Sequence, residues 1–145
     1  IQILCLSELA KRLSKASAEE ELNFNSPESI ARYYMEDLRH EKQEYMKLLL
    51  LNTKTKLIGE TIISKGTVNA AIISPRELFI EALQKGAVSI ILLHNHPSGD
   101  PTPSKEDIII TKQIQKAGEL LGVNLLDHII IGNNCYVSMR VKRLF

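Results

Sequence analysis

A run of seven mostly apolar residues, Ala87–Leu93, constrains the fold of this chain more than any other sequence feature. The run lies between Gly86, which is typical of a helix end, and a loop dense in proline and glycine. A short segment that is apolar on both faces is typical of a buried strand at the centre of a sheet. The run therefore predicts an α/β fold in which helices pack on a sheet.

Helix and strand signals elsewhere in the chain complete this expected architecture. Ser26 and Ser74 each precede a proline that suits the first helical position, and Ser74 with Glu77 has the spacing of a capping box. Gly122 closes a helix that Ser104 opens. The predicted helices lie within residues 1–22, 26–40, 75–85 and 104–122, and the predicted strands are Tyr45–Leu51, Lys56–Ser64, Ala87–Leu93, Asp127–Ile131 and Cys135–Met139.

Length and charge limit the classes of protein that the chain can belong to. Its 145 residues suit one domain, and we expect residues 1–25 to be an N-terminal helix and linker that precede a domain at residues 26–145. The net charge of +1 gives no bulk attraction to nucleic acid or to an anionic membrane. No apolar run approaches the roughly 20 residues that span a bilayer. We therefore expect a cytoplasmic protein without membrane contacts.

Two histidines follow the central strand, and they are the chemically most informative residues. His94 and His96 are two residues apart in extended chain, so that their imidazoles project to the same side. Asp107 lies in the first turn of the next helix, which can bring its carboxylate beside the strand end. Two imidazoles and one carboxylate suit a divalent ion, above all zinc, and three protein ligands leave a position open for water, as in catalytic sites.

Each of these residues also has a purely structural interpretation. His94 and His96 can be polar loop residues, and Asp107 can satisfy helix amides as the third residue after the N-cap Ser104. We expect the ligand role of Asp107 to prevail, because one carboxylate is poorly suited to serve both functions. For His128, near the start of a later strand, a hydrogen-bonded structural role is favoured over that of a fourth ligand or a substrate contact.

A catalytic zinc ion also needs a neighbouring base. Glu41 and Glu44 lie where a helix leads into the first strand, and we favour Glu44 because it directly precedes Tyr45–Leu51. Ser104 can cap its helix and can also donate a hydrogen bond to an oxyanion. A solvated charge is the alternative interpretation of Glu44.

These residues resemble the signature of the JAMM (MPN-plus) zinc metallopeptidases: His94-x-His96-Pro97, six residues, then Ser104-x-x-Asp107, with a glutamate upstream. This motif fixes five residues in fourteen, and the sequence of the whole segment, HNHPSGDPTPSKED, is closest to the RadC-like branch. Further similarity to that branch, from about Ser26 to Met139, lies in QEYMKLLLLNTK, in GTV at Gly66–Val68, in SPRE at Ser74–Glu77 and in LLDHIIIG at Leu125–Gly132.

The resemblance implies a mixed sheet flanked by helices, with layering like that of cytidine deaminases. It implies one zinc ion per chain held by His94, His96 and Asp107, with Glu44 as general acid/base and Ser104 as oxyanion stabiliser. The implied reaction is attack of zinc-bound hydroxide on an amide or isopeptide carbonyl, with a peptide or protein as substrate. RadC-like proteins usually carry an N-terminal helix-hairpin-helix segment, and the first 25 residues contain no glycine-rich hairpin of that kind.

Two other functions compete with a metallopeptidase at this stage. The DNA-repair label of the family suggests a metal-dependent nuclease. A chain of net charge +1 with few aromatic residues, however, offers little positively charged surface to bind the phosphates of a nucleic acid. A non-catalytic interaction module that keeps the fold as a scaffold is the other alternative. The position of Glu41 and Glu44 relative to the metal ligands discriminates between a scaffold and an enzyme.

Overall fold

The apolar run after Gly86 forms the centre of a five-stranded mixed sheet. In this computed structural model, which describes residues 2–66 and 73–145, the strand order is β2-β1-β3-β4-β5. The strands are β1 (Tyr45–Leu51), β2 (Leu57–Lys65), β3 (Ser89–Asn95), β4 (Asn124–Ile131) and β5 (Tyr136–Ser138). Every residue of β3 is buried, as the sequence predicts. The strand is antiparallel to β1 and parallel to β4, which it reaches through the crossover helix α4 (Lys105–Leu121).

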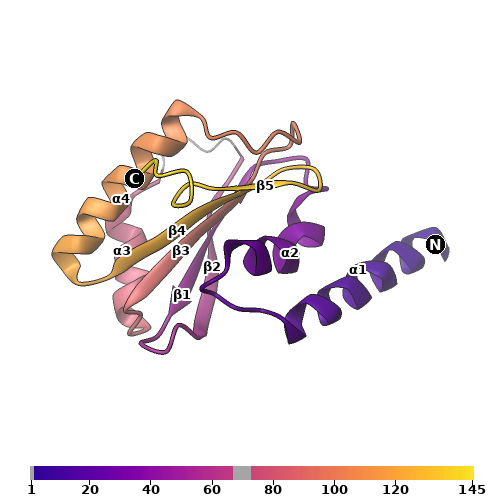
Figure 1. Cartoon of the computed structure of the whole chain (residues 1–145), viewed down its shortest axis with the longest axis horizontal. Helices are drawn as coiled ribbons and strands as arrows, with labels where there is room; N and C mark the ends of the chain where they lie inside the picture. Colours follow the sequence, from indigo (N-terminus) through magenta and orange to yellow (C-terminus); the bar gives the residue numbers. More distant parts are fainter. Residues whose placement is uncertain (1, 67–72) are drawn as a thin grey trace.

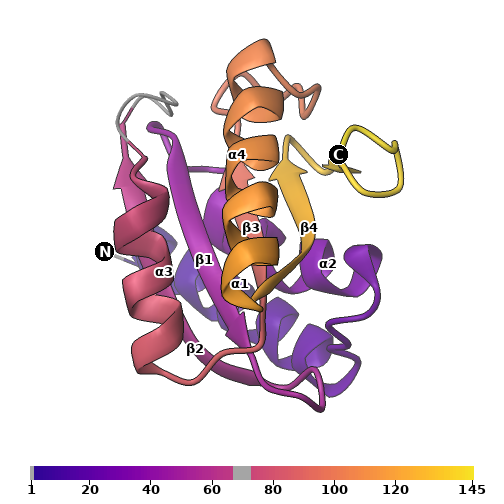
Figure 2. The same ribbon diagram turned by 90° about the vertical axis from the view of Figure 1, so that its left-hand side faces the viewer.

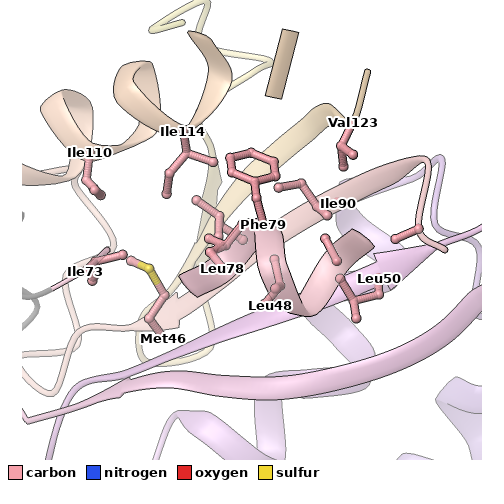
Figure 3. Packing of buried hydrophobic residues seen from close by; sticks show 13 residues of the cluster. Met46, Leu48, Leu50, Ile73, Leu78, Phe79, Ile90, Ile110, Ile114 and Val123 are labelled. Atoms are coloured by element: carbon pink, nitrogen blue, oxygen red, sulfur yellow. The ribbon is translucent and has the colours of Figure 1, made fainter. Parts of the chain in front are cut away.

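Helices cover both faces of the sheet. Figure 2 shows α3 (Pro75–Gln84) and α4 side by side in front of the strands, with α2 (Pro27–Leu38) behind them. The core between the sheet and α3 with α4 contains Met46, Leu48 and Phe79, among other apolar side chains (Figure 3). A second core joins the opposite sheet face to α2. The mixed α/β architecture with flanking helices is therefore confirmed.

The alternation of side chains along the central strands decides which face carries the polar groups. Ile90 and Leu92 face α3 and α4, whereas Leu93 faces α2. The same alternation places His94 on the α3/α4 face, two residues after Leu92. His128 of β4 is paired with Leu92, so it lies on this face as well. Two histidines from neighbouring strands are thus brought under α4.

Helix α1 (Gln2–Glu20) extends away from the rest of the molecule (Figure 1). Its C-terminal half is attached to α2, where Lys15 forms an ion pair with Asp37 and Ala18 is buried. Upstream of this contact the helix exposes large apolar side chains, among them Ile3, Leu6, Leu9 and Leu13. Within residues 2–66 and 73–145, none of the helices combines the length and apolar character needed to cross a bilayer.

The element boundaries mostly follow the sequence signals, with four differences. Strand β3 is Ser89–Asn95 rather than Ala87–Leu93, so it begins and ends two residues later than predicted. Ser74 is the N-cap of α3, but its side chain makes no cap hydrogen bond, so the expected capping box is wrong there. Strand β4 begins at Asn124 rather than Asp127, because it already pairs with the start of β3. Strand β5 is shorter than Cys135–Met139. The GTV motif at Gly66–Val68 falls largely outside the described residues.

Candidate metal centre

The two histidines of the sequence motif lie at the end of β3, where the strand leads into its loop. His94 is completely buried and is paired with Met46 on one side and Ile130 on the other. His96 follows the last residue of the strand, and its amide donates to the carbonyl of Ile131 at 2.9 Å. This bond extends the contact with β4 beyond the strand end. Both imidazoles therefore project toward the same side, as predicted.

Asp107 reaches the histidines from the first turn of α4. Its carboxylate is 2 % exposed, with Oδ1 3.4 Å from His94 Nε2 and Oδ2 3.4 Å from His96 Nε2. The same residue completes a capping box: Oδ2 accepts from the Ser104 amide at 2.7 Å, and Ser104 Oγ accepts from the Asp107 amide at 3.1 Å. Capping therefore does not exclude contact with the histidines, because the capping hydrogen bonds hold the carboxylate toward them.

The three side chains fit a divalent cation. One ligand atom from each of His94, His96 and Asp107 lies within 4.8 Å of the others, and the two Nε2 atoms are 2.9 Å apart. Ligand atoms of a tetrahedral zinc site with bonds of about 2.0–2.1 Å are separated by roughly 3.3 Å. The observed separations of 2.9 and 3.4 Å bracket this value. Two imidazoles and a carboxylate are also the donor types that zinc accepts.

Electrostatics in the cluster follow from burial and from the carboxylate. Burial lowers the pKa of His94 well below its ordinary value, and His128 adds to this effect. The hydrogen bond with Asp107 raises the pKa of His96. Burial alone would raise the pKa of Asp107, but the hydrogen bond from His96 and the charge of His94 hold it below its usual range.

The loop after β3 fixes the orientation of the His96 ring. His96 Nδ1 lies 2.8 Å from the backbone carbonyl of Asp100. Because a carbonyl oxygen only accepts, Nδ1 carries the hydrogen and Nε2 is the atom left to bind a metal. The Asp100 carboxylate in turn accepts from the amide and hydroxyl of Thr102. Sequence reasoning did not identify Asp100, although an Asx-type turn after His-Pro-Ser-Gly is a recognisable signal.

The structure brings Glu44 near the histidines and gives no such contact for Glu41. Glu44 lies two residues before Met46, which is paired with His94. The charge of Glu44 contributes to raising the pKa of His96. Both neighbours of Glu44 are bound by the side chain of Asn95, which accepts from the Tyr45 amide at 2.8 Å and donates to the Gln43 carbonyl at 3.0 Å. Asn95 was not singled out from the sequence, where an asparagine between two histidines carries no distinct signal.

Ser104 and His128 take different positions around this centre. Ser104 is exposed at the start of α4, and in the described part of the chain its hydroxyl oxygen only accepts a hydrogen bond, from Asp107. His128 lies outside the three-residue cluster. Its Nε2 is 2.7 Å from His94 Nδ1, the ring nitrogen of His94 that does not approach Asp107. Its Nδ1 lies 2.6 Å from Thr111 Oγ1. His128 is thus a buried hydrogen-bonded residue, as favoured, but one attached directly to the candidate metal centre.

Fold and cluster together define an α/β domain with a candidate three-ligand metal centre at the end of its central strand. The family model described as "RadC-like JAB domain" matches residues 24–144, and the chain belongs to this family. The sequence resemblance to the RadC-like branch is therefore confirmed.

Curated relatives from bacteria are similar over nearly the whole chain. A "UPF0758 protein" of Clostridium botulinum strain Langeland is 52 % identical over 144 residues, which cover 98 % of this chain and 62 % of the relative. A "UPF0758 protein" of Carboxydothermus hydrogenoformans is 49 % identical over 144 residues, which cover 99 % of this chain and 64 % of the relative. The chain thus spans about 62–64 % of the length of these relatives.

Proposed function

We propose that this chain is a zinc-dependent hydrolase, specifically a metallopeptidase that cleaves peptide or isopeptide bonds. The observation that carries the proposal is the convergence of His94, His96 and Asp107 at one point, with the charge of Glu44 acting on His96. A binding scaffold needs no acid/base group beside its ligands, so the position of Glu44 favours an enzyme over an interaction module. Membership of the JAB family supports the same class of reaction.

Each residue has a distinct task in the proposed reaction. His94, His96 and Asp107 hold the ion, which supplies an activated water and polarises the scissile carbonyl. Glu44 removes a proton from the attacking water and delivers it to the leaving amine. Ser104, whose hydroxyl hydrogen is not used in capping, donates to the oxygen that becomes negative during attack.

The test separates metal binding from proton transfer. We expect Glu44→Gln to keep the zinc content of the wild type and to lose about 10²-fold or more of its turnover, because a neutral amide cannot accept the proton. Glu41→Gln is the matched control and should resemble the wild type. His94→Ala should lose the metal itself. Zinc is measured by elemental analysis, and cleavage by profiling peptide and isopeptide libraries with and without chelator.

Three outcomes would contradict this proposal. Equal zinc content in the wild type and in His96→Ala would show that the ion does not bind to these ligands. Turnover by Glu44→Gln at the wild-type rate would remove the acid/base assignment. Cleavage that persists in the chelator would exclude a metal-dependent reaction altogether.

A further inference from the structure

We propose that His128 and Thr111 are positioning residues that fix the tautomer of His94 and thereby aim its Nε2 lone pair at the metal position. The inference rests on the proposed function and deepens it, since it assigns roles to two side chains that do not themselves face the ion. His128 lies in β4 and Thr111 lies one helical turn after Asp107 in α4. Both residues are 0 % exposed.

The direction of the hydrogen bonds in this series is set by Thr111 in α4. Thr111 Oγ1 lies 2.5 Å from the backbone carbonyl of Asp107, and a carbonyl oxygen has no hydrogen to give. The single hydrogen of the hydroxyl is therefore donated to Asp107. Toward His128 Nδ1, which is 2.6 Å away, the hydroxyl oxygen then acts as an acceptor. It follows that His128 carries its hydrogen on Nδ1.

The same reasoning determines which ring nitrogen of His94 carries its hydrogen. His128 is completely buried and its two ring nitrogens contact neutral groups, Thr111 and His94, so the ring stays uncharged. A neutral ring with hydrogen on Nδ1 has a bare Nε2, which accepts from His94 Nδ1 at 2.7 Å. His94 therefore keeps no hydrogen on Nε2, the atom that lies 3.4 Å from the Asp107 carboxylate.

This chain of hydrogen bonds joins two of the three ligands. It starts at the backbone of Asp107 and ends at the ring of His94, so the turn of α4 that delivers the carboxylate also selects the tautomer of the histidine. His96 receives the equivalent constraint from the carbonyl of Asp100. Partners of metal ligands that fix ring orientation in this way typically change metal affinity by 10–100-fold when removed.

Paired substitutions test the hydrogen-bond chain while changing the volume little. Thr111→Val removes the hydroxyl and Thr111→Ser retains it. His128→Asn leaves the Nε2 position empty, whereas His128→Gln can place an amide oxygen there as acceptor for His94. We expect zinc affinity, measured by competition with a chromophoric chelator, to fall about 10–100-fold in Thr111→Val and His128→Asn. Thr111→Ser, His128→Gln and the remote control His40→Gln should stay within about threefold of the wild type.

A second measurement reads the tautomers directly in the metal-free protein. Nitrogen NMR of the imidazoles should show hydrogen on Nδ1 of both His94 and His128 in the wild type and in Thr111→Ser. Thr111→Val should show mixed tautomers. Thermal unfolding in chelator verifies that each variant folds.

The outcomes of these measurements distinguish two failures. A His94 with its hydrogen on Nε2 in the wild type, or wild-type affinity in folded Thr111→Val, would overturn the inference. A wild-type chain that binds no zinc would instead overturn the proposed function, and the tautomer measurement would still decide whether the hydrogen-bond chain exists.

Discussion

Asp107 combines a structural role with a candidate ligand position in one carboxylate. Its Oδ2 accepts from the Ser104 amide, and both oxygens approach imidazole nitrogens. A capping box is normally a local device that satisfies free helix amides. Here the same hydrogen bonds hold a candidate ligand in place before any ion binds, which reduces the ordering that metal binding would otherwise require.

Two substitutions at Ser104 separate its capping role from its proposed role in catalysis. Ser104→Ala should lower the free energy of unfolding by about 1 kcal/mol, whereas Ser104→Gly should cost only a few tenths. Both variants lack the hydroxyl, so both should lose turnover to a similar extent while retaining zinc. Urea denaturation, elemental analysis and peptide cleavage provide the three measurements. Turnover that follows stability, with Ser104→Gly close to the wild type, would refute the oxyanion role.

The pH dependence of the metal-free protein should reveal the buried His128. Burial lowers the pKa of His128 from 6.5 to about 4. Between these values the unfolded chain binds more protons than the folded one, so the free energy of unfolding should fall as the pH falls. The loss amounts to at most about 3 kcal/mol for this residue. Urea denaturation of the wild type and of His128→Gln in chelator, from pH 7 to pH 4, checks this prediction.

The comparison with His128→Gln isolates this residue from its neighbours. His94 has a pKa shifted in the same direction, whereas the pKa of His96 is raised and acts in the opposite sense. The contribution of His96 remains in the variant, and that of His94 keeps its direction, because burial is its main cause. An equal decline of stability in both proteins would show that His128 does not titrate as a buried neutral ring.

The sequence predicted the cluster of candidate ligands because the constraints on these residues are local. His94 and His96 share a strand face, and Asp107 is a fixed distance into a capped helix. Thr111, Asp100 and the role of His128 were missed, because each depends on a contact between elements. A buried threonine on an apolar helix face and a histidine in an apolar strand have the same appearance in sequence whether or not a partner is present.

At the scale of elements, close contact between α4 and β4 determines where the ligand-bearing helix sits. A Cβ added at Gly118 would lie 2.3 Å from the Val123 carbonyl and 3.2 Å from Phe79 Cζ. Gly118 therefore allows the end of α4 to touch both the chain entering β4 and the side chain of α3. The far end of this helix carries Asp107, so the contact also sets the position of the carboxylate.

Gly118→Ala should be destabilising although it raises helix propensity. Alanine normally stabilises a helix interior by about 1 kcal/mol relative to glycine, but here we expect overpacking to cost about 1–3 kcal/mol net. Gly59→Ala is the control, since its added methyl meets the flexible end of Lys85 at 3.2 Å. Chemical denaturation measures both. An unchanged or raised stability of Gly118→Ala would show that the helix end has room to shift.

Capping signals and the alternation of apolar residues predicted the helices and strands more accurately than they predicted individual side-chain hydrogen bonds. Gly86 and Gly122 have φ angles of 66° and 72°, as expected for residues that end helices. The early start of β4 at Asn124 was not predictable, because polar and charged residues interrupt the pattern there and only pairing with β3 extends the strand. Whether the Ser74 side chain makes a cap hydrogen bond likewise depends on its surroundings rather than on the spacing of Ser74 and Glu77.

At the scale of the whole molecule, α1 should be dispensable for folding. The family match begins at residue 24, and α1 contacts the remainder mainly through its C-terminal half. We expect a chain that begins at Leu22 to unfold cooperatively and to bind zinc as the full chain does. Thermal unfolding and elemental analysis check both properties. Loss of cooperative unfolding would show that the contact of Lys15 and Ala18 with α2 is required.

The contacts that hold Glu44 differ from those that hold the three candidate ligands, so metal content and activity can change independently. The three candidate ligands lie on one stretch, from His94 to Asp107, whereas Glu44 lies on a neighbouring segment whose backbone is bound by the Asn95 side chain and by the Gly66 amide. Under the proposed function, a change at Asn95 would disturb the Glu44 segment without replacing any of the three candidate ligands. Metal content alone would then be a poor measure of activity.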